Sequence, residues 1–139
     1  MRTLAAVALL ACAPAQGCPG LEIKDAWIRE APPGAMMTAA YARLYNAGQR
    51  LLRIDGALGA DFAGAALHRS VVENGISRMV HGEPLELTPG ASGALEPGGW
   101  HLMLMRPVRA LKAGDRVPLA LKCGREATEY TFIVRAPSE

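Results

Sequence analysis

Hydrophobic and polar residues alternate along most of the chain after residue 20, in short runs. Residues 21–28, 40–46 and 128–134 show this period of two, which is typical of strands with one buried face. No apolar period of 3.6 residues lasts beyond two turns after the N-terminal segment, so we expect no long amphipathic helix there. The pattern predicts an all-β protein.

Glycine and proline divide these runs at regular intervals. Pro84, Pro89-Gly90 and Pro97-Gly98-Gly99 cut the chain between residues 79 and 101 into pieces of strand length. Residues 56–64 are small, and we predict a connection there rather than a strand. Short strands at regular spacing without helices favour a two-sheet antiparallel sandwich.

Asn74-Gly75 lies between two short runs that contain β-branched residues, and this dipeptide predicts a tight hairpin because both residues tolerate positive φ. A two-residue turn fixes the register and pairs His68 with His81 and Ser70 with Met79. Directly paired residues project from the same face of a sheet. We therefore expect His68 and Met79 to be diagonal neighbours on one face.

A second segment, residues 100–105, alternates in the same way on a single strand. Trp100, Leu102 and Leu104 form one face, which we expect to pack on the core. The other face carries His101, Met103 and Met105. Thioethers on a strand surface that faces solvent have no packing explanation.

The thioethers and imidazoles of these two segments suit the same metal ion. Thioether sulfur is a soft ligand that prefers Cu(I), and imidazole accepts copper in either oxidation state. Structural zinc would require thiolates, and calcium or magnesium would require carboxylates, which do not cluster here. If the two segments meet, a site with two histidines and two methionines is expected to hold Cu(I).

The spacing of His68, Met79, His101 and Met103 resembles the signature of the periplasmic PCu(A)C-type copper(I) chaperone family. The likeness continues, in order, over residues 21–136. Its other motifs are Ala26-Trp27-Ile28-Arg29, Ala31-Pro32-Pro33-Gly34, residues 97–105 and residues 111–119. Two departures are visible: Arg69 stands where many members have a further methionine, and Trp100 stands where tyrosine is common.

The resemblance implies a cupredoxin-like antiparallel Greek-key β-sandwich that binds Cu(I) and delivers it by ligand exchange. It implies His68, Met79, His101 and Met103 as the metal ligands. The implied recipient is the copper site of cytochrome c oxidase subunit II, reached directly or with Sco-type copper proteins. We expect a monomer that is not an enzyme.

Neighbouring donors leave alternatives open. His81 lies on the predicted site face and could tune the site, and Met105 could replace Met103. Met36 and Met37 could form a second methionine site. Because adjacent strand residues point to opposite faces, packing is favoured for this pair. Some members of the family that the chain resembles carry a Met/His-rich C-terminal extension that is not seen here, so we expect one copper site.

The N-terminus has the features of a secretory signal, with Arg2 followed by an apolar stretch and then Ala13-Pro14-Ala15. We predict a signal over residues 1–17, one domain over residues 18–139, and a periplasmic location without stable membrane insertion after cleavage. Another interpretation makes Cys12 a lipid-anchored residue. In either case, Cys18 and Cys123 remain as a pair, which favours a disulfide in an exported domain.

Composition excludes several functions. The formal net charge is +2 among 139 residues, too small and too scattered to indicate nucleic-acid binding. Ser70 lies near His68, but no carboxylate is placed to orient the histidine and no nucleophile elbow surrounds the serine. The competing interpretations are a metal-free secreted β-sandwich that serves as an interaction module and, less favoured, a copper electron carrier.

Overall fold

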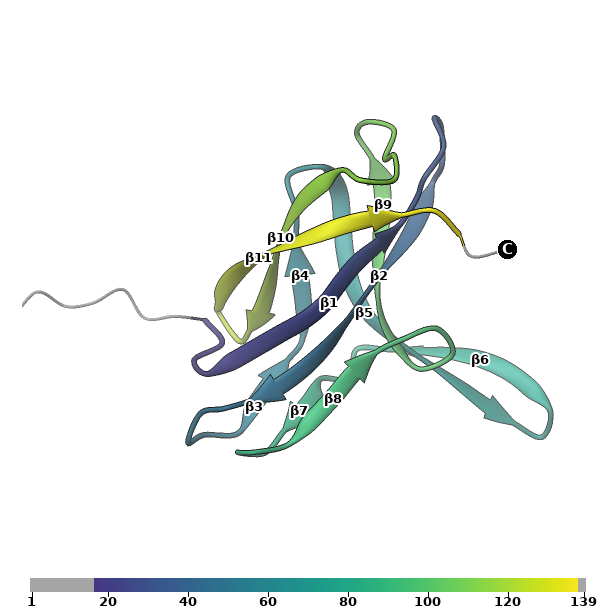
Figure 1. Cartoon of the computed structure of the whole chain (residues 1–139). Helices are drawn as coiled ribbons and strands as arrows, with labels where there is room; N and C mark the ends of the chain where they lie inside the picture. The colour runs from purple at the N-terminus through teal and green to yellow at the C-terminus, as the bar shows by residue number, and fades with distance from the viewer. Residues whose placement is uncertain (1–16, 138–139) are drawn as a thin grey trace, which may run out of the picture.

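A computed structural model describes residues 17–137, and these fold into eleven β-strands (Figure 1). The strands are β1 (Leu21–Arg29), β2 (Met37–Asn46), β3 (Leu52–Ile54), β4 (Gly56–Leu58), β5 (Phe62–Glu73), β6 (Ile76–His81), β7 (Leu85–Leu87), β8 (Ser92–Leu95), β9 (Trp100–Pro107), β10 (Arg116–Cys123) and β11 (Glu126–Arg135). The all-β prediction is confirmed. Among the described residues, no helix is long and apolar enough to cross a membrane.

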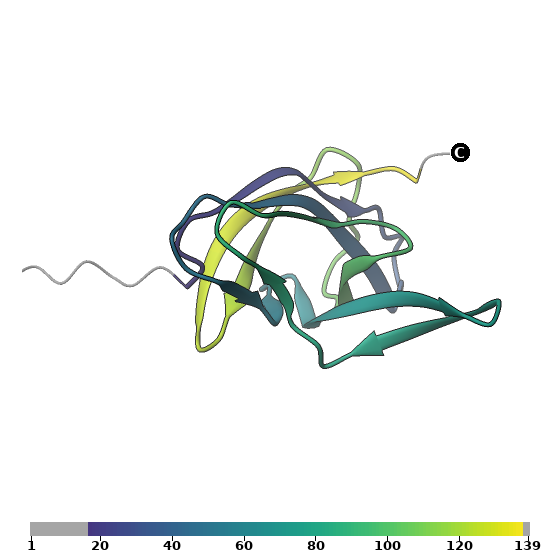
Figure 2. The same cartoon turned by 90° about the horizontal axis from the view of Figure 1, so that it is seen from below.

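The layers of the sandwich are formed mainly by one continuous hydrogen-bonded sheet. Nine strands pair in the order β4-β10-β11-β1-β2-β8-β9-β5-β6, with a further pairing of β2 and β9, while β3 and β7 form a separate two-stranded sheet. Strand β2 joins the layers because its first half pairs with β9 and its second half with β8. Figure 2 shows this sheet curving around the interior of the protein. The fold is a cupredoxin-like β-sandwich, as predicted.

One strand pair runs against the antiparallel prediction. The first strand, β1, pairs in parallel with the last strand, β11, through Trp27 and Ile133 and the two positions that follow. A single parallel bridge also joins β8 to β9. Alternation in a sequence reveals which face of a strand is buried but not its direction, so these pairings could not be predicted from the pattern.

Alternation along the strands builds the core. Leu102 and Leu104 of β9 are fully buried, and they meet buried residues of β10 and β11 in one cluster. The largest buried side chains are Phe132, Ile28, Leu44, Ile54, Leu102, Leu104, Leu111, Leu119 and Leu121. The strands of the sandwich therefore turn one set of side chains inward and leave the other set on the outer surface, whereas β6 of the projecting hairpin has no buried side chain.

Residues 56–64 are not the plain connection that we predicted. They contain β4 and the start of β5. Strand β4 pairs with β10 through Gly56, Ala57 and Leu58, and Gly59 lies so close to Leu119 that a Cβ there would approach within 2.6 Å. Small residues at these positions allow close approach of two strands, which sequence alternation alone does not indicate.

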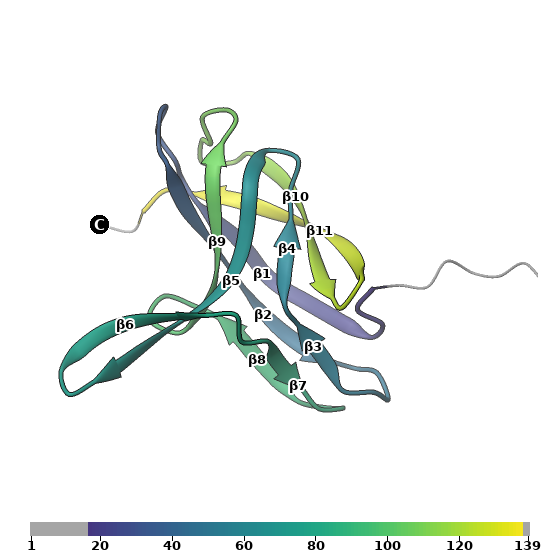
Figure 3. The same cartoon turned by 180° about the vertical axis from the view of Figure 1, so that it is seen from behind.

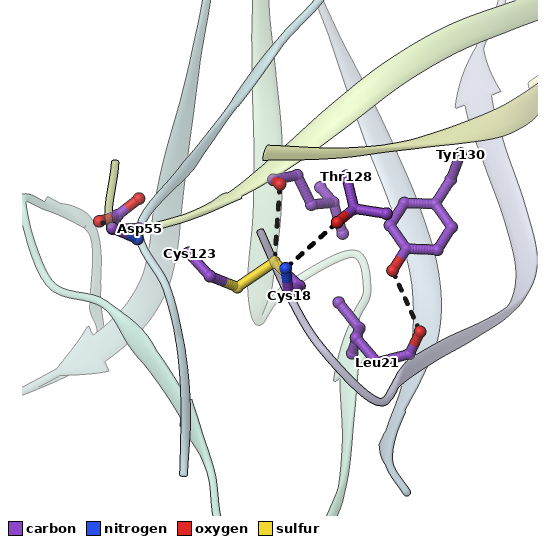
Figure 4. Close-up of a disulfide and its surroundings, with 8 residues drawn as sticks. Cys18, Leu21, Asp55, Cys123, Thr128 and Tyr130 are labelled. Carbon is purple, nitrogen blue, oxygen red and sulfur yellow. Dashed lines mark hydrogen bonds between the residues drawn. A yellow bond between two sulfur atoms is a disulfide. The ribbon is translucent and has the colours of Figure 1, made fainter. Parts of the chain in front are cut away.

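A disulfide joins Cys18 to Cys123, with their Cα atoms 5.4 Å apart (Figure 4). The backbone N–H of Cys18 donates to Thr128 Oγ1 at 3.1 Å, and the Tyr130 hydroxyl donates to the Leu21 carbonyl at 3.0 Å. The predicted pairing is confirmed. It fixes the start of the described chain to the end of β10.

The β5-β6 hairpin extends away from the sandwich, as the views in Figures 1 and 3 both show. The purple start of the described chain lies on the side of the molecule opposite to this hairpin. Residues 1–16 of the predicted signal segment, including Cys12 of the alternative lipidation, lie outside the described residues.

Candidate metal centre

The hairpin has the register that the Asn74-Gly75 turn predicts. All six predicted pairs form, from Glu73 with Ile76 out to His68 with His81. Asn74 and Gly75 have φ angles of 51° and 76°, as a two-residue turn of this kind requires. His68, Met79 and His81 consequently lie on one face of the hairpin.

Strand β9 brings the second half of the predicted site to the same face. It pairs with β5 so that His68 is opposite His101 and Ala66 is opposite Met103. Leu67 and Leu102, the intervening pair, are buried in the core. Because residues alternate along both strands, the two histidines and Met103 share the face of the sheet opposite to Leu67 and Leu102.

The rings of His68 and His101 stand together at the centre of this surface. Their centroids are 5.9 Å apart and their planes meet at 80°. His68 Nδ1 and His101 Nε2 are buried ring nitrogens without a hydrogen-bond partner. Buried polar atoms are normally paired, so two orphan nitrogens on adjacent rings indicate that a ligand of another kind belongs there.

Backbone contacts fix the orientation of His101. Its Nδ1 lies 3.0 Å from the Gly99 carbonyl oxygen, which also accepts the Ser70 N–H at 3.0 Å. A carbonyl oxygen only accepts, so Nδ1 carries the proton and Nε2 presents its lone pair. An outer hydrogen bond of this kind sets the tautomer and angle of metal-binding histidines.

The environment of His68 favours its neutral form. Burial lowers the pKa of His68 below the ordinary value of 6.5, and the nearby His101 and His81 rings lower it further. Only a neutral imidazole has a lone pair free for a metal. At neutral pH the ring is therefore in the form that a ligand requires.

The two methionines flank the histidine pair from opposite sides. Met103 lies one diagonal step from His68, beside Ala66, whereas Met79 lies one diagonal step the other way, opposite Ser70. Met79 is 48% exposed and Met103 is half-buried. The structure thus places all four residues on one face, with the imidazoles adjacent and a flexible thioether on each side.

His81 is also next to His68, with ring centroids 5.2 Å apart. Its side chain is exposed. Within residues 17–137, no three side chains among His, Cys, Asp and Glu are grouped so that they could hold a metal ion. The three histidines therefore do not form a metal site by themselves.

Arg69 and Trp100 lie on the opposite face from the candidate ligands. They are paired between β5 and β9, and the Arg69 guanidinium lies 5.3 Å from the centre of the Trp100 ring. Arg69 also contacts Glu83 at 2.7 Å. Trp100 packs against the core as predicted. The side chain of a methionine at position 69 would therefore project from the face of the sheet opposite to that of His68.

Met36, Met37 and Met105 were not predicted to gather, but they do. Met37 is directly opposite Met105, and all three line one surface hollow. The expectation that Met36 and Met37 pack in the interior is wrong, because they are 61% and 59% exposed. Strand β2 begins at Met37 beside β9, a long-range pairing that leaves no local signal in the sequence.

A family model described as "Putative lipoprotein LpqE-like" matches residues 21–134. The chain belongs to the LpqE-like family. This is the family of the PCuAC domains, so the resemblance seen in the sequence is confirmed. A relative from Leifsonia xyli subsp. xyli, described as a "Putative lipoprotein", is 32% identical over 110 residues, which are 78% of this chain. The chain spans 65% of that relative's length.

Solved structures share the fold of this family member. The apo PCuAC domain from PmoF1 has a TM-score of 0.69 and 21% identity, with 86% of this chain and 97% of that domain covered. The copper-bound PCuAC domain from PmoF2 has a TM-score of 0.68 and 22% identity, with 86% and 96% covered. The Cu(I) form of DR1885 from Deinococcus radiodurans has a TM-score of 0.61 and 24% identity, with 90% and 83% covered.

Proposed function

We propose that this protein binds one Cu(I) ion between His68, Met79, His101 and Met103 and passes it to a partner by ligand exchange. The observation that carries the proposal is the pair of buried, unpartnered ring nitrogens, His68 Nδ1 and His101 Nε2, on rings 5.9 Å apart. A metal ion would satisfy both nitrogens, whereas no protein group among the described residues does.

The donor set supports Cu(I) in particular. Two thioethers beside two imidazoles form a soft site without thiolate or carboxylate, and such a site suits Cu(I) better than zinc, calcium or magnesium. Copper-bound and Cu(I)-bound forms are among the structural neighbours. Cu(I) is here the cargo of the protein, so no catalytic step is required.

The exposure of the ligands supports transfer. His101 is 5% exposed, whereas Met79 is 48% exposed on the projecting hairpin. An incoming ligand reaches Met79 first and His101 last. Exchange then proceeds with one ligand replaced at a time, and the metal is never released as a free ion.

The location and recipient extend the proposal. The family description and the curated relative both name lipoproteins, which supports export and gives weight to a lipid anchor at Cys12. We place the protein in the periplasm, with residues 18–139 forming the domain. The recipient implied by the sequence resemblance is cytochrome c oxidase subunit II, alone or with a Sco-type protein.

Competition with a chromogenic Cu(I) chelator under anaerobic, reducing conditions tests the proposal. We expect the purified protein to withdraw one equivalent of Cu(I) from the chelator at or above the chelator's own affinity. Absence of competition would leave the metal-free interaction module as the better interpretation. An intense, stable visible band on oxidation would instead favour an electron carrier.

A further inference from the structure

The methionines of this chain are distributed in an unusual way. Of six methionines, Met1 lies outside the described residues and the other five are Met36, Met37, Met79, Met103 and Met105. None of these five belongs to the buried core. Methionine is ordinarily a core-filling residue, so its complete absence from the described core points to a role for the sulfur atoms.

Only two of the five belong to the site already described. The other three line a surface hollow of about 450 Å³ together with Ala63, Gly64 and Arg106. Met37 of β2 is directly opposite Met105 of β9, and directly paired residues have Cβ atoms about 5 Å apart. Two flexible thioethers at that separation can turn their sulfur atoms toward one ion.

Small residues leave space around these sulfurs. A Cβ at Gly64 would lie 3.1 Å from the terminal methyl carbon of Met105, so the glycine allows Met105 to lie across β5. Met36 is fixed next to the pair because its carbonyl accepts the N–H of Arg106 at 2.8 Å. A third thioether is thereby supplied at the rim of the hollow.

We propose that Met36, Met37 and Met105 form a second binding site for Cu(I), built from thioethers alone. Thioether sulfur selects soft monovalent copper, and the hollow offers no carboxylate that would attract hard cations. The site lies on the same face of β9 as the first one, since Met105 is two residues beyond Met103, or about 7 Å along the strand.

The second site is the weaker of the two. It has no imidazole, Met36 and Met37 are more exposed than Met79, and Arg106 lines the same hollow. A neighbouring positive charge opposes the binding of a cation. We expect an affinity at least tenfold lower than that of the first site, which suits a position where copper enters or leaves the protein.

Methyl NMR with ¹³C-methyl methionine, during anaerobic titration with Cu(I), tests this proposal. The expected result is a second equivalent whose binding shifts the Met36, Met37 and Met105 methyl signals. The double variant Met37→Leu/Met105→Leu keeps side-chain volume and should bind the second equivalent of Cu(I) with more than tenfold lower affinity. Val108→Leu, a matched change at an exposed apolar residue after β9, should retain it.

The titration distinguishes failure of the second Cu(I) site from failure of the first site, at His68, Met79, His101 and Met103. In His68→Ala/His101→Ala the first equivalent should disappear while the three methyl signals still shift. If these signals stay unchanged up to several equivalents of Cu(I), or if Met37→Leu/Met105→Leu retains the second equivalent, the second site does not exist and the methionine surface serves only for contact. If the Met79 and Met103 signals alone stay unchanged, the first site is wrong and the second stands.

Discussion

His68 and His101 occupy directly paired positions on neighbouring strands, and each carries a buried ring nitrogen without a hydrogen-bond partner. In the proposed Cu(I) site, this pairing would hold the two imidazoles as a fixed pair of ligands. The thioethers of Met79 and Met103 would complete the site by rotation of their own side chains.

Loss of either ligand from β9 should therefore weaken Cu(I) binding strongly. We expect His101→Ala and Met103→Ala each to reduce affinity at least tenfold, equivalent to about 1.4 kcal/mol, in the chelator competition. His81→Ala is the matched control, because His81 is exposed beside His68 but outside the proposed ligand set, and its affinity should stay within threefold. Wild-type affinity in either β9 variant would contradict the assignment.

The copper-free protein should lose stability as the solution becomes acidic. His68 has a pKa below 6.5 in the fold because of burial and the two neighbouring rings, whereas the unfolded chain has the ordinary value. Above pH 6.5 both states are neutral at this residue. Below it the unfolded state binds the proton more readily, so the free energy of unfolding falls as pH decreases toward the folded pKa.

Urea unfolding between pH 7.5 and pH 5.5 measures this dependence. His68→Asn removes the titrating group, so its unfolding free energy should fall less over the same interval. Equal slopes in the two proteins would show that His68 does not carry the effect.

The disulfide should contribute substantially to stability. Cys18 and Cys123 are separated by 105 residues, and the chain-entropy model gives about 4 to 5 kcal/mol for a loop of that length. We expect Cys18→Ser/Cys123→Ser to lower the free energy of unfolding by an amount of this order in guanidinium titrations. Thiol counting on denatured, unreduced protein should find neither cysteine free, and two free thiols would refute the bond.

Asn46 should be the most sensitive polar residue outside the site. It is fully buried, its amide donates to the Arg50 and Leu87 carbonyls, and its carbonyl accepts the Gly48 N–H. Three hydrogen bonds at about 1 kcal/mol each suggest a loss of about 3 kcal/mol in Asn46→Ala. Gln49→Ala, an exposed residue in the same turn, should change thermal unfolding little.

The turn and register of the hairpin could be predicted from the sequence because their determinants are local. Asn74-Gly75 fixes the turn, the turn fixes the register, and the register places Met79 beside Ser70. The alternation of residues 100–105 likewise predicted that Leu102 and His101 lie on opposite faces of the strand. These features depend on neighbours within a few residues, so a pattern can reveal them.

Pairings between distant strands could not be derived from the residues. Nothing near His101 in the chain specifies that β9 pairs with β5, or that Met37 meets Met105. The same holds for the parallel contact of β1 with β11. The resemblance to a known family implied that His101 and His68 come together, although not how their strands pair, while the methionine hollow had no such guide.

The position of Cys18 has a consequence for how the protein would work when tethered. Its bond to Cys123 holds the beginning of the described chain on the side of the molecule away from the β5-β6 hairpin. An attachment to a membrane through the N-terminal segment would then direct His68 and Met79 outward, toward whatever protein approaches from the aqueous side.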